Sequence, residues 1–505
     1  MTRVIQEVPS STTSGTPSAF IKPLYKKNLA VMGTTGLVLG LGLTGSSPAN
    51  AVVAPFVCTA ANRAVATGDP DVDFDRINFI HNSFYGVPDP QGQICLSGNF
   101  VLDRDFDYGM DVHFYGEGNS SSISHPGGQL FGHQLGEDYT LTIENLTVKN
   151  STTTHAIKGK HVVIKNSTFS GNTGGAVWAR GDVTVTNSVF SGNSGGSGAA
   201  IFAADEEDSI PRAVLITGST FYNNEADFDG GAVFGYGSVE ISNSTFVDNT
   251  AKAGGAVYVT AIFDSGALNV TNSTFKNNVV SGDDAEGGAL FAESGQVIFS
   301  TFVDNTAPSP VEGGEKPGNA IYKYGSSQFN VGGNIFAGSS SYPQLGYGVD
   351  VSPFIDLGGN VFSTSSATET DITQDDSSVF GASLISIFGT TAPVLATFSP
   401  NSSGTQTIGL AAGSPALNIV PNDVPFTSVT SDQRGATRSH PADAGAFEGV
   451  VAPTPTPTPT PSTAPAALAK TGSQDSLWAT IAAGSLLLVG GVVTAIASRL
   501  RRQTK

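Results

Sequence analysis

Apolar and polar residues alternate along short segments throughout the middle of this chain. Segments such as Val183–Thr186, Val239–Ser242 and Leu268–Thr271 place an apolar residue at every second position. A two-residue period is typical of a β-strand with one buried face, because successive side chains of a strand point to opposite sides. The pattern therefore predicts a protein built mainly of short β-strands.

A phrase of the form Phe-x-x-Asn closes one such segment in each of six successive repeats. The steps from one phenylalanine to the next are 21, 31, 25, 29 and 27 residues, which are periods typical of solenoid proteins. Because the phrase is constant while the step varies, we expect the phrase in the core of each coil and the variable residues in rim loops. The pairs are Phe169/Asn172, Phe190/Asn193, Phe221/Asn224, Phe246/Asn249, Phe275/Asn278 and Phe302/Asn305.

Stacked coils would place phenylalanine over phenylalanine in the interior and asparagine over asparagine at a turn. The side-chain amides of such asparagines can hydrogen-bond to their counterparts above and below. A small-residue cluster of the Gly-Gly-Ala type follows each phrase and predicts a tight bend. A second asparagine series, three residues before the phenylalanine and interrupted by Gly218 and Phe299, suggests another ladder. It comprises Asn166, Asn187, Asn243 and Asn272.

These repeats resemble the right-handed parallel β-helix of the pectin-lyase-like superfamily. The pairing of Gly-Gly-Ala with Phe-x-x-Asn is similar to the repeats of bacterial polymorphic outer-membrane adhesins. The resemblance covers residues from about 140 to 365, and it implies an all-β, single-stranded parallel β-helix without specifying an activity. We expect helix repeats over 140–380, an N-terminal cap with the first coils at 52–139, and a C-terminal cap module at 381–449.

The N-terminus has the order of an export signal. Two lysines precede an apolar stretch over 29–43, and a small-x-small motif ends at Ala51. This order predicts a signal peptide at 1–51 with cleavage after Ala51. An uncleaved membrane anchor is the alternative.

The C-terminus carries a second set of signals. A Pro/Thr-rich segment at 450–467 is expected to be an extended stalk, and it precedes a pentapeptide, an apolar span at 477–498 and a basic end. The order resembles the sortase-anchoring signal of Gram-positive surface proteins, in an actinobacterial form with alanine where the common LPxTG motif has proline. The resemblance implies that a sortase cleaves after the threonine and joins it to peptidoglycan; an ordinary membrane span is the alternative for 468–505. The pentapeptide is Leu468, Ala469, Lys470, Thr471 and Gly472.

Charge and cysteine content limit the classes of binding partner and the cellular compartment that we expect. The chain has a formal net charge of −19, and residues 52–471 hold 41 acidic against 16 basic side chains. Nucleic acids and bare anionic membranes are therefore not expected partners. The two cysteines, Cys58 and Cys95, are expected to form a disulfide in an exported chain.

The run from Gly413 to Glu448 resembles the C-terminal module of bacterial surface β-helix proteins known for their "choice-of-anchor" tails. The resemblance implies a surface protein and no particular reaction. We expect the apolar residues of this run to cover the last coil. We also expect Asp432, Arg434, Arg438 and Asp443 to pair with one another as a structural cap.

Motifs of the polysaccharide-degrading enzymes that share this fold are absent from the sequence. The polygalacturonase motifs NTD, GHG and RIK do not occur, and the closest fragment is Gly132-His133-Gln134. Acidic residues do gather in three rim loops, and the first two of these loops should lie about 10 Å apart along the helix axis. That spacing is compatible with a carboxylate pair or a Ca²⁺ site, the alternative being solvated loop acids. The catalytic candidates are Asp227, Asp229, Asp283, Asp284 and Glu286, with Glu312 and Glu315 in the third loop.

Histidines and aromatic residues are further candidates for a site. The histidines lack metal-ligand spacing, so no metal or other cofactor is expected apart from Ca²⁺. Tyr236 and Tyr258 follow the Gly-Gly-Ala clusters of neighbouring coils and predict an aromatic stripe for sugar stacking, with buried packing as the alternative. The histidines are His125, His133, His155 and His161, and the aromatic set is Trp178, Tyr222, Tyr236, Tyr258, Tyr322 and Tyr324.

These features predict a secreted, wall-anchored parallel β-helix that binds glycans or the surfaces of host or neighbouring cells without catalysis. Its expected partners are a sortase, peptidoglycan after anchoring, and a glycan or surface ligand. The first alternative is a polysaccharide lyase or glycoside hydrolase that uses the acidic rim loops. The second is a passive surface spacer.

Overall fold

The computed structural model describes most of the chain between residues 57 and 450. The described ranges are 57–84, 92–118, 120–133, 138–152, 155–204, 212–260, 266–282, 285–307, 318–338, 343–348, 351–363, 372–373, 375–396, 405–423 and 425–450. The predicted signal peptide, sortase pentapeptide and span at 477–498 lie outside these ranges. Within them, no helix is long and apolar enough to cross a membrane.

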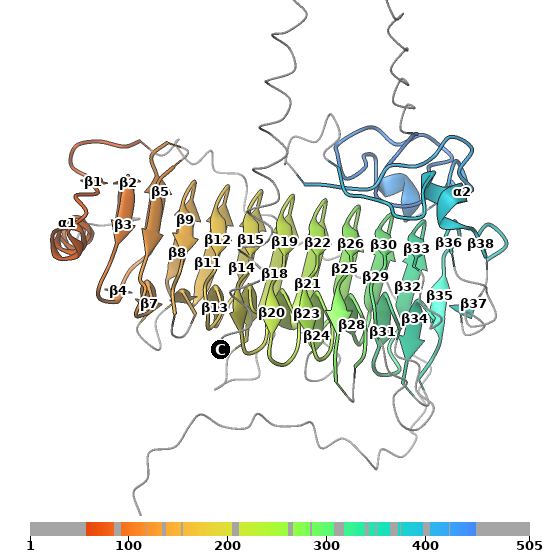
Figure 1. Cartoon of the computed structure of the whole chain (residues 1–505), viewed down its shortest axis with the longest axis horizontal. Helices are drawn as coiled ribbons and strands as arrows, with labels where there is room; N and C mark the ends of the chain where they lie inside the picture. Colours follow the sequence, from red (N-terminus) through yellow and green to blue (C-terminus); the bar gives the residue numbers. More distant parts are fainter. Residues whose placement is uncertain are drawn as a thin grey trace, which may run out of the picture. The chain divides into compact units, whose positions relative to one another are not determined.

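The strands of successive coils stack in parallel and in register, and the coils between the two ends contribute to three faces (Figure 1). Sheet A contains β1 (Arg63–Val65), β2 (Gly92–Ser97), β5 (Val112–Gly116), β8 (Thr140–Glu144), β11 (His161–Lys165), β14 (Val183–Thr186), β18 (Arg212–Thr217), β21 (Val233–Ser242), β25 (Leu268–Thr271), β29 (Gly295–Ile298), β32 (Phe329–Gly332), β35 (Phe354–Asp356) and β37 (Ile372–Thr373). β21 continues through the corner and belongs to sheets A and C.

Sheet B carries the phenylalanines of the repeat and has twelve strands within the described residues. They are β3 (Asn99–Val101), β6 (Ser122–Ser124), β9 (Thr147–Lys149), β12 (Thr168–Ser170), β15 (Val189–Ser191), β19 (Thr220–Tyr222), β22 (Thr245–Val247), β26 (Thr274–Lys276), β30 (Thr301–Val303), β33 (Ile335–Ala337), β36 (Val361–Phe362) and β38 (Val379–Phe380).

Sheet C follows the glycine clusters, and a short sheet D lies between sheets B and C. Sheet C contains β4 (Phe106–Tyr108), β7 (Phe131–His133), β10 (Ile157–Gly159), β13 (Val177–Ala179), β17 (Ile201–Ala203), β21, β24 (Val257–Thr260), β28 (Leu290–Ala292), β31 (Ile321–Lys323) and β34 (Leu345–Tyr347). Sheet D contains β16 (Ser194–Gly195), β20 (Glu225–Ala226), β23 (Thr250–Ala251) and β27 (Val279–Val280).

A continuous stack of phenylalanine rings fills the interior behind sheet B. The rings of Phe169, Phe190 and Phe221 lie 4.9 Å apart, centroid to centroid, and are nearly parallel. The stack continues to the pair Phe362 and Phe380, also 4.9 Å apart. Burial of one such ring stabilises the fold by roughly 1.5 to 3 kcal/mol, so the repeated phenylalanine is a main source of stability in each coil. The other rings of the predicted phrase, Phe246, Phe275 and Phe302, belong to the same stack.

The asparagines of the phrase form a buried ladder at the turn after sheet B. Asn193 Nδ2 donates to Asn224 Oδ1 at 2.9 Å and to the Phe169 carbonyl of the coil before at 3.1 Å. The same Asn224 oxygen accepts the Asn193 backbone N–H at 3.2 Å. The ladder begins with Asn172, whose Nδ2 donates to Asn193 Oδ1 at 2.9 Å. An interior amide of the ladder thereby satisfies buried polar groups of the coils before and after its own.

The ladder continues without interruption through Asn249 and Asn278 to Asn305. Asn224 Nδ2 donates to Asn249 Oδ1, Asn249 Nδ2 to Asn278 Oδ1, and Asn278 Nδ2 to Asn305 Oδ1, each at 2.9 Å. Asn249 and Asn278 are fully buried, and their amides also donate to the carbonyls of Phe221 and Phe246. These asparagines hold the coils together, and as buried side chains they are not available to a ligand.

A serine ladder, which was not predicted from the sequence, runs along the other end of sheet B. The hydroxyl of Ser219 accepts the Ser188 backbone N–H at 3.1 Å and donates to the Thr217 carbonyl at 2.9 Å. The sequence does contain a signal for this ladder: serine stands two residues before every repeat phenylalanine. The ladder comprises Ser167, Ser188, Ser219, Ser244, Ser273 and Ser300.

The second asparagine series is not a hydrogen-bonded ladder, and that expectation is wrong. Asn166, Asn187 and Asn243 have positive φ angles of 47°, 49° and 51°, and Gly218 at the same position has 60°. No side-chain hydrogen bond joins these residues in the described part of the chain. Asn272 shares the turn, but its amide bonds to Ser431 and Arg438 of the C-terminal region. Asparagine is there because it tolerates the left-handed conformation that this turn requires, as glycine does.

The N-terminal end is covered by α1 (Pro70–Asn82), a helix that was not predicted from the sequence. Its N-cap Asp69 accepts backbone N–H groups from the first turn, while Ile77 and Ile80 are fully buried in the main core. Figure 1 shows α1 beside β1 at the start of the coils. The helix shields the first coil, whose strand edges would otherwise lack partners.

The C-terminal module reaches the last coils through Val361 and Val379, but it packs along the outer face of sheet B over several coils, so the expectation of a cover for the last coil is corrected. α2 (Leu384–Phe388), the 3₁₀ helix η2 (Phe426–Ser428) and irregular chain form a core with the outward residues of sheet B. Phe426 meets Phe299 edge to face at 5.5 Å, and the Gly445 N–H donates to the Gly333 carbonyl at 2.7 Å. Figure 1 shows this module, in blue, beside the strands from β22 to β36.

Candidate functional site on the rim of sheet C

Two of the acidic rim residues that the structure describes, Asp229 and Glu286, lie near one tyrosine. Asp229, Ala253 and Glu286 share one register position on successive coils, joined by parallel bridges. Asp229 and Glu286 therefore lie two coils apart, which is about 10 Å at the usual strand spacing, with a small residue between them. Tyr258, on β24 of the intervening coil, interacts electrostatically with both carboxylates.

Burial perturbs the protonation of this cluster. Desolvation raises the pKa of Asp229 to about 6, and the nearby Lys252 opposes that shift. Desolvation, with the charges of Asp229 and Glu286, raises the pKa of the Tyr258 phenol well above its usual value. Below about pH 6 the Asp229 carboxyl is therefore largely neutral and can donate a hydrogen bond, whereas above that pH it is an acceptor only.

The remaining rim candidates are divided between the described and undescribed residues. Asp227 is exposed, beside an exposed Phe228 whose ring lies 4.8 Å from Lys252 Nζ. Asp283 and Asp284, and likewise Glu312 and Glu315, lie outside the described residues. Of the expected carboxylates, only Asp229 and Glu286 are thus placed in a common setting.

An aromatic column runs along the outer face of sheet C, but its composition differs from the prediction. Trp178, Phe202, Phe234, Tyr258, Phe291 and Tyr322 are in register on successive strands. Tyr236 is not part of the column, because its partner in the register is Thr260. The other two aromatic candidates, Tyr222 and Tyr324, are 46% and 49% exposed.

The rings of this column stack face to face from Phe202 to Tyr322, whereas Trp178 meets Phe202 edge to face, with ring centroids 6.1 Å apart. Phe234 and Tyr258 lie 5.4 Å apart with an interplanar angle of 6°, and Tyr258 and Phe291 lie 4.3 Å apart at 12°. At the first ring, Lys158 Nζ lies 3.7 Å from the centre of Trp178. Because the ring faces are occupied by each other or by the lysine, the column presents ring edges outward and serves packing more than sugar stacking.

The histidines have structural surroundings. His155 is buried against Trp178 and Phe202, and desolvation followed by the Lys158 charge lowers its pKa to about 4. His161 Nε2 lies 2.9 Å from Asp138 and its Nδ1 accepts the Asp182 N–H. His125 accepts the Gly127 N–H and contacts Asp105. His133 ends β7. In the described part of the chain these histidines do not converge on one site.

The ions of the C-terminal module are buried and engaged with one another or with the backbone. Asp432 pairs with Arg434 at 2.7 Å, as expected. Arg438 pairs with Glu448 at 3.1 Å, a residue outside the four that were expected to pair with one another, so that expectation is corrected for Arg438. The Asp443 carboxylate instead accepts the backbone N–H groups of Asn418 and Gly449. These contacts fix the loops of the module, so the ions have a structural role.

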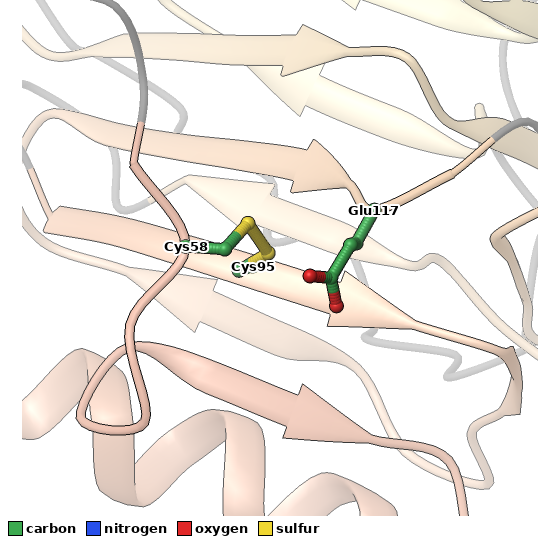
Figure 2. Close-up of side chains that lie close together, drawn as sticks. All are labelled: Cys58, Cys95 and Glu117. Atoms are coloured by element: carbon green, nitrogen blue, oxygen red, sulfur yellow. A yellow bond between two sulfur atoms is a disulfide. The ribbon is translucent and has the colours of Figure 1, made fainter.

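One further group of potential ligand atoms lies at the N-terminal cap. Figure 2 shows Cys58 and Cys95 joined by a disulfide with Glu117 beside it. The bonded sulfurs cannot act as thiolate ligands, and Glu117 forms a 2.6 Å ion pair with Arg63. The predicted disulfide is therefore present, and this group is not a metal centre.

Comparison with known proteins agrees with the fold. The family model for a right-handed β-helix region matches residues 112–352. A solved structure titled pectate lyase Pel9A is similar at 16% identity, covers 73% of this chain and 90% of its own, and has a TM-score of 0.33. No curated protein matches. The parallel strand register and the family model define the chain as a right-handed parallel β-helix solenoid, and the likeness to the lyase structure, at this identity and TM-score, carries no argument.

Proposed function

We propose that this chain is exported, joined to the cell wall of a Gram-positive, actinobacterial type of cell, and used there as a binding protein without catalytic activity. The proposal rests on the two terminal signals and on the outward side chains that repeat from coil to coil. The ligand class is a glycan or a protein on a host or neighbouring surface.

The observation that carries the binding proposal is the in-register repetition of outward side chains. Sheets A, B and C offer the same kind of position once per coil, about every 4.8 Å. Such a surface makes many equivalent, individually weak contacts along an extended partner, and linked contacts raise the overall affinity steeply. A catalytic centre needs instead a few convergent groups at one point.

The support for wall attachment is the order of stalk, LAKTG pentapeptide, apolar span and basic end. The test is Thr471→Ala in a sortase-positive host, with fractionation of wall, membrane and medium. Wild type should be released from the wall fraction by muramidase, and T471A should remain in the membrane or medium. Equal recovery of both chains from the wall would overturn the anchoring proposal.

A second candidate, an enzyme acting on polysaccharides, is favoured by one observation. Asp229 has a pKa raised to about 6 and lies two coils from Glu286 with Tyr258 between them, which resembles the acid and base arrangement of an inverting hydrolase. Two coils of separation is close to the upper end of the range of about 6.5 to 9.5 Å for such pairs. A lyase would also need a basic residue at the reacting carbon, and Lys252 lies over the Phe228 ring instead.

A further inference from the structure

Among the described residues, one column of outward residues on sheet B is covered by the C-terminal module at one end and uncovered at the other. The column runs in register through Thr147, Thr168, Val189, Thr220, Thr245, Thr274 and Thr301. The C-terminal module buries the last three of these threonines to 0–1% exposure. The first four residues, which we call the open threonine face, are half-buried.

The covered half shows what the column binds. The Thr245 hydroxyl donates to the Gln406 carbonyl at 2.6 Å and accepts the Gln406 N–H at 3.2 Å. The next residue of that segment, Thr407, meets the Thr274 hydroxyl of the next coil at 2.9 Å. Consecutive residues thus contact consecutive coils, so the docked segment runs along the helix axis. Further along, the Thr301 hydroxyl accepts the Ala446 N–H at 2.9 Å.

The open half repeats this chemistry without an occupant among the described residues. The hydroxyls of Thr147, Thr168 and Thr220 make no hydrogen bond within the described part of the chain, whereas Val189 offers an apolar contact at the same position. Tyr222, two residues after Thr220 on β19, is 46% exposed and flanks the face. The open face is therefore continuous with an established peptide interface and has the same register and donors.

We infer that the open threonine face binds an extended polypeptide segment of another protein, oriented along the helix axis as Gln406 and Thr407 are. The inference rests on the proposed binding function and narrows its ligand class at this face. A hydroxyl that both donates to a carbonyl and accepts the N–H of the same residue is suited to a peptide backbone. The occupant is expected to place a small apolar side chain against Val189 and polar groups on either side of it.

The probe is a fluorescein-labelled peptide of residues 403–411, which contains the segment that docks on the covered half. Fluorescence polarisation with the full-length chain in mild detergent should give saturable binding. Thr168→Val with Thr220→Val removes two hydroxyls while keeping β-branched side chains, and it should weaken binding about thirtyfold, since each neutral hydrogen bond contributes about 1 kcal/mol and 1.4 kcal/mol is a factor of about ten. Tyr222→Ala, an exposed change, should weaken binding several-fold.

The matched control is Thr184→Val, a half-buried outward threonine of β14 on sheet A, which should bind the peptide as wild type does. Absence of saturable binding, or equal binding by wild type and the double variant, would overturn the inference; the latter would mean that the peptide displaces the module instead. A parallel assay with polygalacturonate distinguishes failure of the proposed binding function from failure of the peptide assignment at the open threonine face. Retention of the polysaccharide without peptide binding would leave the binding function standing and overturn only the peptide assignment.

Discussion

Asparagine plays two distinct roles in this chain, and the backbone angle separates them. Ladder asparagines such as Asn224 are fully buried and hydrogen-bonded on both sides. Turn asparagines such as Asn223 have positive φ and are exposed. Asparagine recurs at both kinds of position, but sequence alone does not distinguish the roles, because asparagine is favoured in amide ladders and in left-handed turns alike.

Asn224→Ala should destabilise the fold by about 3 to 5 kcal/mol, because it leaves buried groups of Asn193 and the Phe190 carbonyl without partners. Denaturant unfolding measures the loss. The matched control is Asn223→Gly, which keeps the left-handed turn and should change stability by less than about 0.5 kcal/mol. A loss below about 1 kcal/mol for Asn224→Ala would contradict the role of the ladder.

The raised pKa of Asp229 predicts how the stability of the fold depends on pH. Its pKa is raised from 3.8 to about 6 in the folded chain, so the folded state binds more protons than the unfolded state between these values. Stability should therefore fall as the pH rises from about 4 to 6 and then level off. Asp229→Asn should reduce this fall and be more stable than wild type at pH 7. The unfolding midpoint from pH 4 to 8 measures it, with the exposed Asp227→Asn as control; an unchanged pH slope in Asp229→Asn would refute the assignment.

At the scale of elements, the left-handed turn before sheet B has the same residue types in most coils and differs where the C-terminal module packs on it. Phe299 occupies a left-handed position with φ of 50°, where other coils have asparagine or glycine. It does so because Phe426 and Arg438 of the C-terminal module pack on its ring, Arg438 at 3.8 Å. The sequence shows that Phe299 interrupts the asparagine series. The cause is a contact between residues far apart in the chain, which the local pattern does not contain.

Phe299→Asn should relax the local backbone and loosen the module. Loss of the buried ring costs about 3 to 5 kcal/mol and relief of the left-handed strain returns about 1, so a net destabilisation of about 2 to 4 kcal/mol is expected. Limited proteolysis of the module, followed by mass spectrometry, detects the loosening. Asn187→Gly is the control at an uncovered coil. Equal protease resistance of Phe299→Asn and wild type would show that the ring does not hold the module.

At the scale of the whole molecule, the sequence predicts the solenoid and the existence of its two caps, but not how the caps are built or placed. Period, phrase and glycine clusters define the stacked coils, because these features repeat and are local. The helix α1 and the placement of the module on sheet B do not repeat, and they depend on which outward residues meet. The rim cluster was predicted only in part for the same reason: register places Asp229 and Glu286 on either side of Ala253, whereas the position of Tyr258 between them follows from packing.

The disulfide ties the N-terminal cap to the first coils, with a sequence separation of 37 between Cys58 and Cys95. Cys58→Ser with Cys95→Ser should cost about 3 to 4 kcal/mol in the loop-entropy estimate. Hydrogen exchange should show the loss in α1, β1 and β2 first, while strands beyond β12 keep their protection, because contacts in a solenoid extend only to neighbouring coils. Uniform loss of protection along all coils would contradict this local role.

The central claim is that the chain binds without cleaving. Polygalacturonate and a neutral glucan, each incubated with the full-length chain and Ca²⁺, should keep their length distribution in size-exclusion chromatography, whether or not they elute with the protein. Asp229→Asn with Glu286→Gln serves as the matched variant and should behave as wild type. Shortened polysaccharide with the wild-type chain, and intact polysaccharide with the variant, would contradict the claim and make the Asp229–Glu286 pair an active site.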